Sequence, residues 1–266
     1  MHDRRDGPML AYGPDLARER TLNDGSRRAV DVVAAPTRVA DRDTDPPYLY
    51  PAYESTRRRA PARPLVFLPH GASETTGPVL GRERVQPGDA DLTAQHGGEP
   101  IGERIIVSGR IVDSDGRPVR DSLVEVWQAN AAGRYRHEVD EHPAPLDPNF
   151  TGLGRTLTDH DGRYRFVTIK PGAYPWRNHP NAWRPAHIHF SVFGSQFPQR
   201  LVTQMYFEGD PLFYQDPIFN SIPQDARPLV IARLDMDTAR PEWALAHRFD
   251  IVLRGRRATP FDEDDD

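Results

Sequence analysis

Cysteine is absent from all 266 residues, and its absence removes several classes of chemistry at once. Disulfide-stapled folds, zinc–thiolate sites, iron–sulfur clusters and cysteine nucleophiles are excluded. Any metal site in this chain must therefore draw on histidine, aspartate, glutamate or tyrosine side chains.

Long apolar runs and a strong net charge are also missing. No run approaches the roughly 18 apolar residues of a membrane span, and Met1–Gly7 lacks the apolar region of a secretory signal. The net charge of −5 and the pI of about 6.1 give no bulk attraction to nucleic acid or anionic membranes. We therefore expect a cytoplasmic protein.

The apolar content is low as well, at 37%. Part of the chain must then be poorly buried, or buried against another chain. The 27 prolines and 20 glycines favour loops and strands over long helices. The length allows one large domain or two small ones, and all-β sandwiches often use this length for one.

Residues 1–100 differ from the rest of the chain. They contain mixed Arg/Asp sequence at Asp41–Asp45, a proline-rich stretch at Asp45–Pro51 and the basic run Arg57–Arg59. Such a segment buries too little apolar surface to fold by itself. It is either a disordered tail or an extended, irregular arm that wraps the body or a partner subunit.

Residues 101–257 carry repeated strand signals separated by turn clusters such as Asp113–Gly116 and Asp159–Gly162. This alternation predicts an all-β fold with a β-sandwich core. Residues 258–266 predict a solvated acidic tail. The expected strands are Arg104–Val112, Leu123–Trp127, Arg163–Ile169, Ala186–Phe193, Leu201–Phe207, Leu229–Leu234 and Arg248–Leu253.

The most informative motif is His187-Ile-His189 within the strand Ala186–Phe193. Residues i and i+2 of a strand share a face, so the two imidazoles lie side by side, while Ile188 and Phe190 face the core. Two neutral imidazoles suit Zn, Cu, Fe or Ni. The alternative is a pair of surface histidines on a half-exposed strand.

Two tyrosines precede this pair in loop-like sequence. Tyr135 follows a glycine turn, and Tyr174 lies in the proline-flanked segment Lys170–Asn178. Taken alone, each tyrosine is more often a packing residue than a ligand, so these residues leave the metal site open.

Several motifs in fixed order resemble the intradiol ring-cleaving dioxygenases. They are Val124–Asn130, Gly133–His137, Asp147–Phe150, Ile169–Asn178, Trp183–Phe190, Gln204–Asp210 and Arg248–Gly255. The resemblance implies a non-haem Fe(III) site with Tyr135, Tyr174, His187 and His189 as ligands. A trivalent ion favours anionic oxygen donors, and it deprotonates a phenol whose ordinary pKa is near 10.

The resemblance also assigns roles around the iron. Tyr174 would be displaced by the substrate and would accept one of its protons, and Arg184 would stabilise negative charge on the ring. The substrate pocket would be lined by Tyr53, Trp176, Arg184, Gln204 and Ile218.

Within the family, the motifs are most similar to the branch that cleaves protocatechuate with dioxygen. Those enzymes are αβ oligomers, which implies an α subunit as the partner of this chain. Catechol or hydroxyquinol as the substrate is one alternative, although the proline-rich residues 1–100 do not resemble the helical N-terminal region of those enzymes. A non-catalytic β-sandwich binding module is a second alternative, and a zinc hydrolase is a poor third, because the chain offers two tyrosines and no nearby acidic ligand motif.

Overall fold

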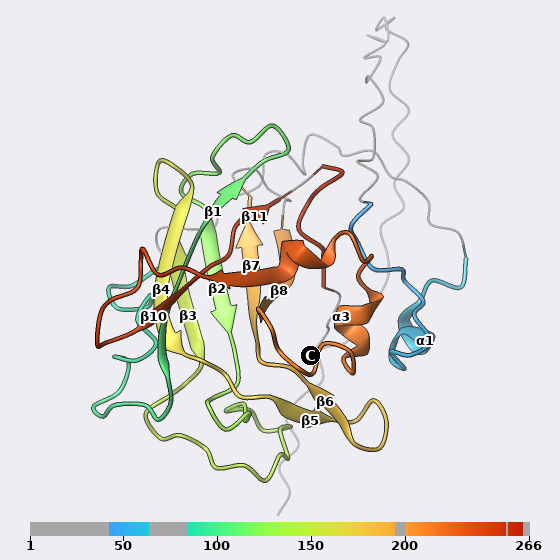
Figure 1. The fold of residues 1–266 in the computed structure, drawn as a ribbon, viewed down its shortest axis with the longest axis horizontal. Coiled ribbons are helices and arrows are strands. Elements are labelled where there is room, and N and C mark those ends of the chain that lie inside the picture. Colours follow the sequence, from blue (N-terminus) through green and yellow to red (C-terminus); the bar gives the residue numbers. More distant parts are fainter. Residues whose placement is uncertain (1–42, 64–83, 195–199, 254, 263–266) are drawn as a thin grey trace, which may run out of the picture. The chain divides into compact units, whose positions relative to one another are not determined.

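The structure is a computed structural model that describes residues 43–63, 84–194, 200–253 and 255–262 (Figure 1). Strands dominate these residues, and the helices among them are short. The strands are β1 Arg104–Val112, β2 Leu123–Trp127, β3 Leu153–Leu157, β4 Arg163–Ile169, β5 Tyr174–Trp176, β6 Ala182–Arg184, β7 His187–Phe193, β8 Arg200–Phe207, β9 Ile231–Leu234, β10 Leu245–Arg248 and β11 Ile251–Val252. The helices are α1 Thr56–Arg59, α3 Pro217–Ser221 and the 3₁₀ helix η2 Arg227–Val230.

One mixed sheet connects nine of these strands. Its order is β11-β1-β10-β9-β8-β7-β2-β3, and β4 pairs with β1 outside this path. Strand β1 is parallel to β10 and antiparallel to β4. The β5–β6 hairpin forms a separate two-stranded sheet outside the nine-stranded one (Figure 1).

The sheet folds so that its two halves face each other across the largest of three buried hydrophobic clusters among the described residues. Phe166 of β4 contacts Phe190 of β7 with ring centroids 5.8 Å apart, and Tyr164 lies 5.9 Å from the same ring. Alternate residues of β1, such as Ile105 and Val107, belong to the same buried cluster as Phe190. The predicted all-β sandwich is confirmed.

Five of the seven predicted strands agree with the structure within one residue, whereas β3, β5 and β6 were not predicted. The other two predicted strands differ for local reasons. The 3₁₀ helix η2 precedes β9 because Pro228 has no N–H to donate to a sheet. The predicted strand Arg248–Leu253 is divided between β10 and β11. Between them the Asp250 side chain, and not the backbone, accepts the N–H of Arg110 at 2.8 Å.

The described parts of the N-terminal arm contact the sandwich of their own chain. Asn178 accepts the N–H of Glu54 and donates to the carbonyl of Ala52, both at 2.8 Å. Further along, Leu92 is fully buried and donates its N–H to Val167 of β4. The predicted boundary at residue 100 and the packing of the arm on a partner remain predictions, and residues 1–42 and 64–83 lie outside the described ranges.

The structure differs from the predicted solvated tail at its first residues. Ala258 and Thr259 are buried, and Asp262 donates its N–H to the carbonyl of Val202 on β8 at 2.8 Å. Phe261 donates its N–H to Asp45, which joins this segment to the arm. The difference arises because small residues ahead of the acidic run are buried and the backbone there is hydrogen-bonded. Residues 263–266 lie outside the described ranges.

None of the helices in the described ranges combines the length and the apolar character needed to cross a membrane.

Candidate metal and catalytic site

Strand β7 places the two histidines on one face and the core residues on the other. Ile188, Phe190 and Val192 belong to the sandwich core. His187 and His189 lie on the opposite face, each only 2% exposed, with ring centroids 4.9 Å apart. The structure thus brings together the two imidazoles predicted from the period of two.

Hydrogen bonding orients the ring of His187 toward the site. Its Nδ1 lies 2.7 Å from the carbonyl oxygen of Pro185, which assigns the proton to Nδ1 and leaves a lone pair on Nε2. That Nε2 lies 3.3 Å from the hydroxyl of Tyr174. Burial, with smaller contributions from Arg184 and His189, holds the pKa of His187 well below its usual value. The ring is therefore neutral, the form in which histidine binds a metal.

Stacking and register fix the second imidazole. Trp127 of β2 is the cross-strand partner of His189, and their rings stack at 4.8 Å with an angle of 7°. The Nε2 of His189 lies 3.1 Å from the hydroxyl of Tyr135. Both histidines therefore direct Nε2 toward a tyrosine hydroxyl.

The segments that precede the two tyrosines, a loop before Tyr135 and the approach to β5 before Tyr174, cross at two glycines. Gly133 has φ +76°, and a Cβ on it would lie 2.1 Å from the carbonyl oxygen of Ala173. Gly172 approaches the other loop just as closely, since its Cβ would lie 2.4 Å from the carbonyl oxygen of Ala131. Only glycine permits this approach, and it brings the rings of Tyr135 and Tyr174 to 5.5 Å, edge to face.

The four side chains fit a transition-metal ion. Metal bonds of about 2.0–2.2 Å to nitrogen and oxygen place neighbouring donor atoms about 3 Å apart. The observed Oη–Nε2 separations are 3.1 Å and 3.3 Å. Two phenols and two neutral imidazoles suit a hard ion such as Fe(III), because the phenolates balance its charge. Tyr135 and Tyr174 are half-buried, so the four side chains are partly open to solvent on the tyrosine side.

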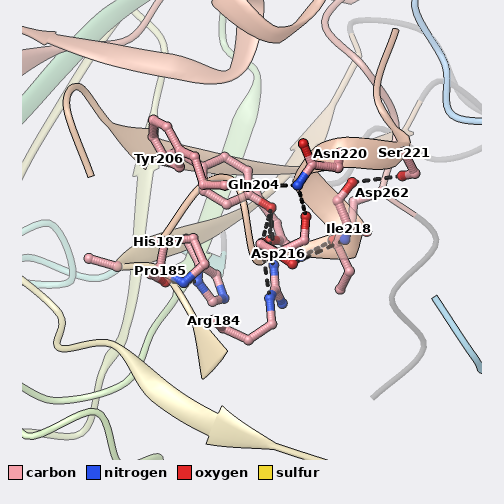
Figure 2. A network of polar contacts seen from close by, with 12 residues as sticks. Arg184, Pro185, His187, Gln204, Tyr206, Asp216, Ile218, Asn220, Ser221 and Asp262 are labelled. Atoms are coloured by element: carbon pink, nitrogen blue, oxygen red, sulfur yellow. Dashed lines mark hydrogen bonds and ion pairs between the residues drawn. The ribbon is translucent and has the colours of Figure 1, made fainter. Parts of the chain in front are cut away.

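Arg184 lies at the centre of a buried polar network next to these ligands (Figure 2). Arg184 is 1% exposed, and its side chain forms an ion pair with Asp216 at 3.3 Å. Its Nη2 also donates to the hydroxyl of Tyr206 at 3.0 Å and to Oε1 of Gln204. Gln204 in turn donates its amide N–H to Asp262 of the C-terminal segment.

The remaining predicted pocket residues lie in contact with this network. The Trp176 ring lies 5.6 Å from the guanidinium carbon of Arg184 and 5.6 Å from the ring of Tyr53. Ile218 donates its N–H to Asp216 at 3.0 Å. Tyr53 and Ile218 are each 5% exposed and Trp176 is half-buried. All nine predicted site residues therefore lie in one connected region.

Three further residues of the site were not predicted from the sequence. Asp216 carries the Arg184 ion pair, Tyr206 links Arg184 to the ring of His187 at 5.8 Å, and Trp127 stacks on His189. Sequence patterns could have identified two of them. Asp216 precedes Pro217, which is typical of a helix N-cap, and Tyr206 is two residues after Gln204 and so shares its strand face.

Two family models and several relatives match this chain. A family model described as Dioxygenase matches residues 75–255, and one described as Protocatechuate 3,4-dioxygenase beta subunit N terminal matches residues 40–71. The chain is 58% identical over 232 residues to a protocatechuate 3,4-dioxygenase beta chain from Burkholderia cepacia, covering 86% of this chain and 99% of the relative. It is 30% identical over 217 residues to a protocatechuate 3,4-dioxygenase alpha chain from Pseudomonas putida, covering 74% and 98%. Among solved structures, a 3-chlorocatechol 1,2-dioxygenase from Rhodococcus opacus 1CP is similar with 27% identity and a TM-score of 0.48, covering 62% of this chain and 64% of that chain.

Proposed function

The chain belongs to the intradiol dioxygenase family, and from this premise we propose that it cleaves protocatechuate with dioxygen to 3-carboxy-cis,cis-muconate. We propose that a non-haem Fe(III) is bound by Tyr135, Tyr174, His187 and His189. The observation that carries the proposal is the convergence of two phenol oxygens on two imidazole Nε2 atoms at 3.1 Å and 3.3 Å.

The bound ferric ion would acidify the hydroxyls of a catechol-type substrate and draw both of them to one centre. In this chain, Tyr174 would be the ligand that accepts a substrate proton. It is half-buried on the β5–β6 hairpin, whereas the histidines are held within the sheet. If Tyr174 gave way to a substrate oxygen, its side chain would move outside the main sheet.

Arg184 and Trp176 would handle the aromatic ring. The guanidinium is buried beside the ligands and remains charged at any physiological pH. Its fixed N–H groups can stabilise negative charge that develops on the ring during attack by dioxygen. Trp176 would supply an aromatic face next to it, and Tyr53 packs against Trp176 with the two rings tilted by 58°.

We also propose an α subunit as the partner of this chain. Its relatives include proteins named as the beta and the alpha chain of one enzyme. Protocatechuate carries a ring carboxylate that needs a cationic or hydrogen-bonding partner when buried. Within this chain, Arg184 is already engaged by Asp216, Tyr206 and Gln204, so the carboxylate partner would come from the other subunit.

The test is purification of the chain with and without its co-expressed partner. Iron content, the visible spectrum before and after anaerobic protocatechuate, and oxygen uptake on protocatechuate and catechol are measured for each. We expect a coloured tyrosinate–iron band in both samples, and protocatechuate turnover mainly in the mixed oligomer.

Three outcomes contradict the proposal in different ways. Full protocatechuate activity from this chain alone removes the two-subunit pocket. A clear preference of the mixed oligomer for catechol or hydroxyquinol changes the substrate. A colourless, iron-free protein without oxygen uptake indicates a binding module that keeps only the fold.

A further inference from the structure

We propose that Asp216 is a positioning residue that fixes the Arg184 guanidinium relative to helix α3. The inference rests on the proposed function, because it deepens the role given to Arg184 there. Neither residue needs to contact the metal for this role. The assignment comes from the contacts of one buried carboxylate.

The two oxygens of Asp216 perform different tasks (Figure 2). Its Oδ2 accepts from both Nε and Nη2 of Arg184 at 3.3 Å. Its Oδ1 accepts the backbone N–H of Ile218 at 3.0 Å, which makes Asp216 the N-cap of α3. Asp216 is fully buried. One side chain therefore joins the cation to the first turn of the helix.

Charge explains why a carboxylate occupies this position. A buried guanidinium that lacks an anionic partner is strongly disfavoured. Tyr206 and Gln204 offer oxygen acceptors to Arg184 but no negative charge. Asp216 offsets the buried charge and, by accepting from two nitrogens of the fork, restricts how the guanidinium plane can rotate. The orientation of the N–H groups of Arg184 depends on this residue.

The same carboxylate relates the cation to a wall of the predicted pocket. Ile218, the second residue of α3, is one of the predicted pocket residues. Pro217 is the first residue of the helix, a position that proline favours. A shift of Asp216 would move Ile218 and Arg184 together. A fixed separation between a cation and an apolar wall is what holds a flat ring in one orientation.

A purely structural role for Asp216, as a cap of α3, predicts different behaviour after substitution. After Asp216→Asn, the amide oxygen can still accept from Ile218, and the amide N–H₂ then faces the N–H donors of Arg184. The cap survives while the contact with the guanidinium becomes repulsive. Asp216→Ser also keeps a capping oxygen but removes the carboxylate, and it serves as the second variant if Asp216→Asn folds poorly.

The experiment is a double-mutant cycle on the mixed oligomer. Asp216→Asn, Arg184→Gln and the double variant are compared for kcat, KM for protocatechuate and iron content. We expect Asp216→Asn to lower kcat about tenfold or more while KM changes less than about threefold. In the Arg184→Gln background, the same substitution should change kcat less than about twofold.

Asp147→Asn is the matched control. Asp147 is also buried and bridges two groups, since its two oxygens accept the N–H groups of Ile101 at 2.7 Å and Asn149 at 2.8 Å. This variant should lose stability and keep its kcat. Equal losses of kcat in Asp147→Asn and Asp216→Asn would indicate general destabilisation and overturn the inference.

A crystal structure of the Asp216→Asn oligomer provides a readout that does not depend on activity. We expect a displaced guanidinium, an unchanged α3 and full iron content. An unmoved Arg184, or additive effects in the cycle, overturns the positioning role while the proposed function stands. If the wild-type oligomer does not cleave protocatechuate, the proposed function fails, and the displacement of Arg184 in the crystal still decides whether Asp216 positions it.

Discussion

The histidine half and the tyrosine half of the site are built in different ways. His187 and His189 belong to a regular strand in the middle of the sheet, and both are buried. Tyr135 follows a loop and Tyr174 begins β5, and the segments before them approach closely at Gly133 and Gly172. The histidine half therefore lies within the main sheet, whereas the tyrosine half lies outside it and is only half-buried. The ligand that we propose to be displaced by the substrate, Tyr174, belongs to the tyrosine half.

The largest effect should follow substitution in the histidine half. His187→Ala or His189→Ala should lose most of the bound iron, since each removes one of four protein donors, and the metal-free protein should keep its fold because the core lies on the other strand face. Iron analysis and thermal unfolding measure both quantities. His160→Ala, on an exposed turn, is the control and should keep its iron; full iron in either site variant would contradict the shared-face arrangement.

Damage to the loop crossing should be smaller but should reach the metal as well. Gly133→Ala strains a positive-φ position, which costs about 1–2 kcal/mol, and its Cβ also meets the carbonyl of Ala173. Gly116 has nearly the same φ, +77°, with no atom near its Cβ position. Gly116→Ala should therefore show the strain alone. The free energy of unfolding in urea and the iron affinity are measured for both variants. Equal losses in Gly133→Ala and Gly116→Ala would show that the close approach at Gly133 does not place the tyrosines.

Removing the Tyr174 hydroxyl from the tyrosine half should leave metal binding largely intact. Tyr174→Phe should retain iron but change the visible absorption and slow substrate binding, because the ligand that accepts a substrate proton is gone. Stopped-flow mixing with anaerobic protocatechuate measures the rate. Tyr214→Phe, at a 75% exposed tyrosine, should behave like wild type. Unchanged turnover and colour in Tyr174→Phe would exclude Tyr174 from the site.

The smallest effect concerns a buried histidine on a different strand. Burial and, to a lesser extent, Lys170 lower the pKa of His247 on β10, and Glu103 opposes them. Neither ring nitrogen of His247 has a hydrogen-bond partner in the part of the chain that the structure describes. The unfolded chain therefore takes up protons first as the pH falls below about 6.5, so the free energy of unfolding should decrease there.

The pKa of His187 is lowered as well, so a variant that changes His247 alone is needed to separate the effects of the two histidines. Urea unfolding of the metal-free protein should show a smaller loss at acidic pH in His247→Leu than in wild type. An unchanged pH dependence would assign the whole effect to other groups.

The strand-borne features of the molecule are those that its sequence predicts well. Periodic apolar residues predicted β1, β2 and β4 with their observed boundaries, and the spacing of His187 and His189 predicted their common face. Placement of Tyr135 and Tyr174 in the site came from a family resemblance, because no periodicity connects two loops. Asp216 could not be predicted as a site residue. Its role depends on an ion pair with Arg184, 32 positions away in sequence, and a single sequence does not show such a contact.

The parallel pairing of β1 with β10 and β11 has a consequence for biosynthesis. Strand β1 leaves the ribosome well before the strands that cover its second edge, so Ile105 and its neighbours wait for partners about 140 residues later. During that interval an unpaired apolar edge is exposed to other nascent chains. Slower elongation or chaperone binding between residues 112 and 245 should therefore change the yield of native protein more than the same delay after residue 252.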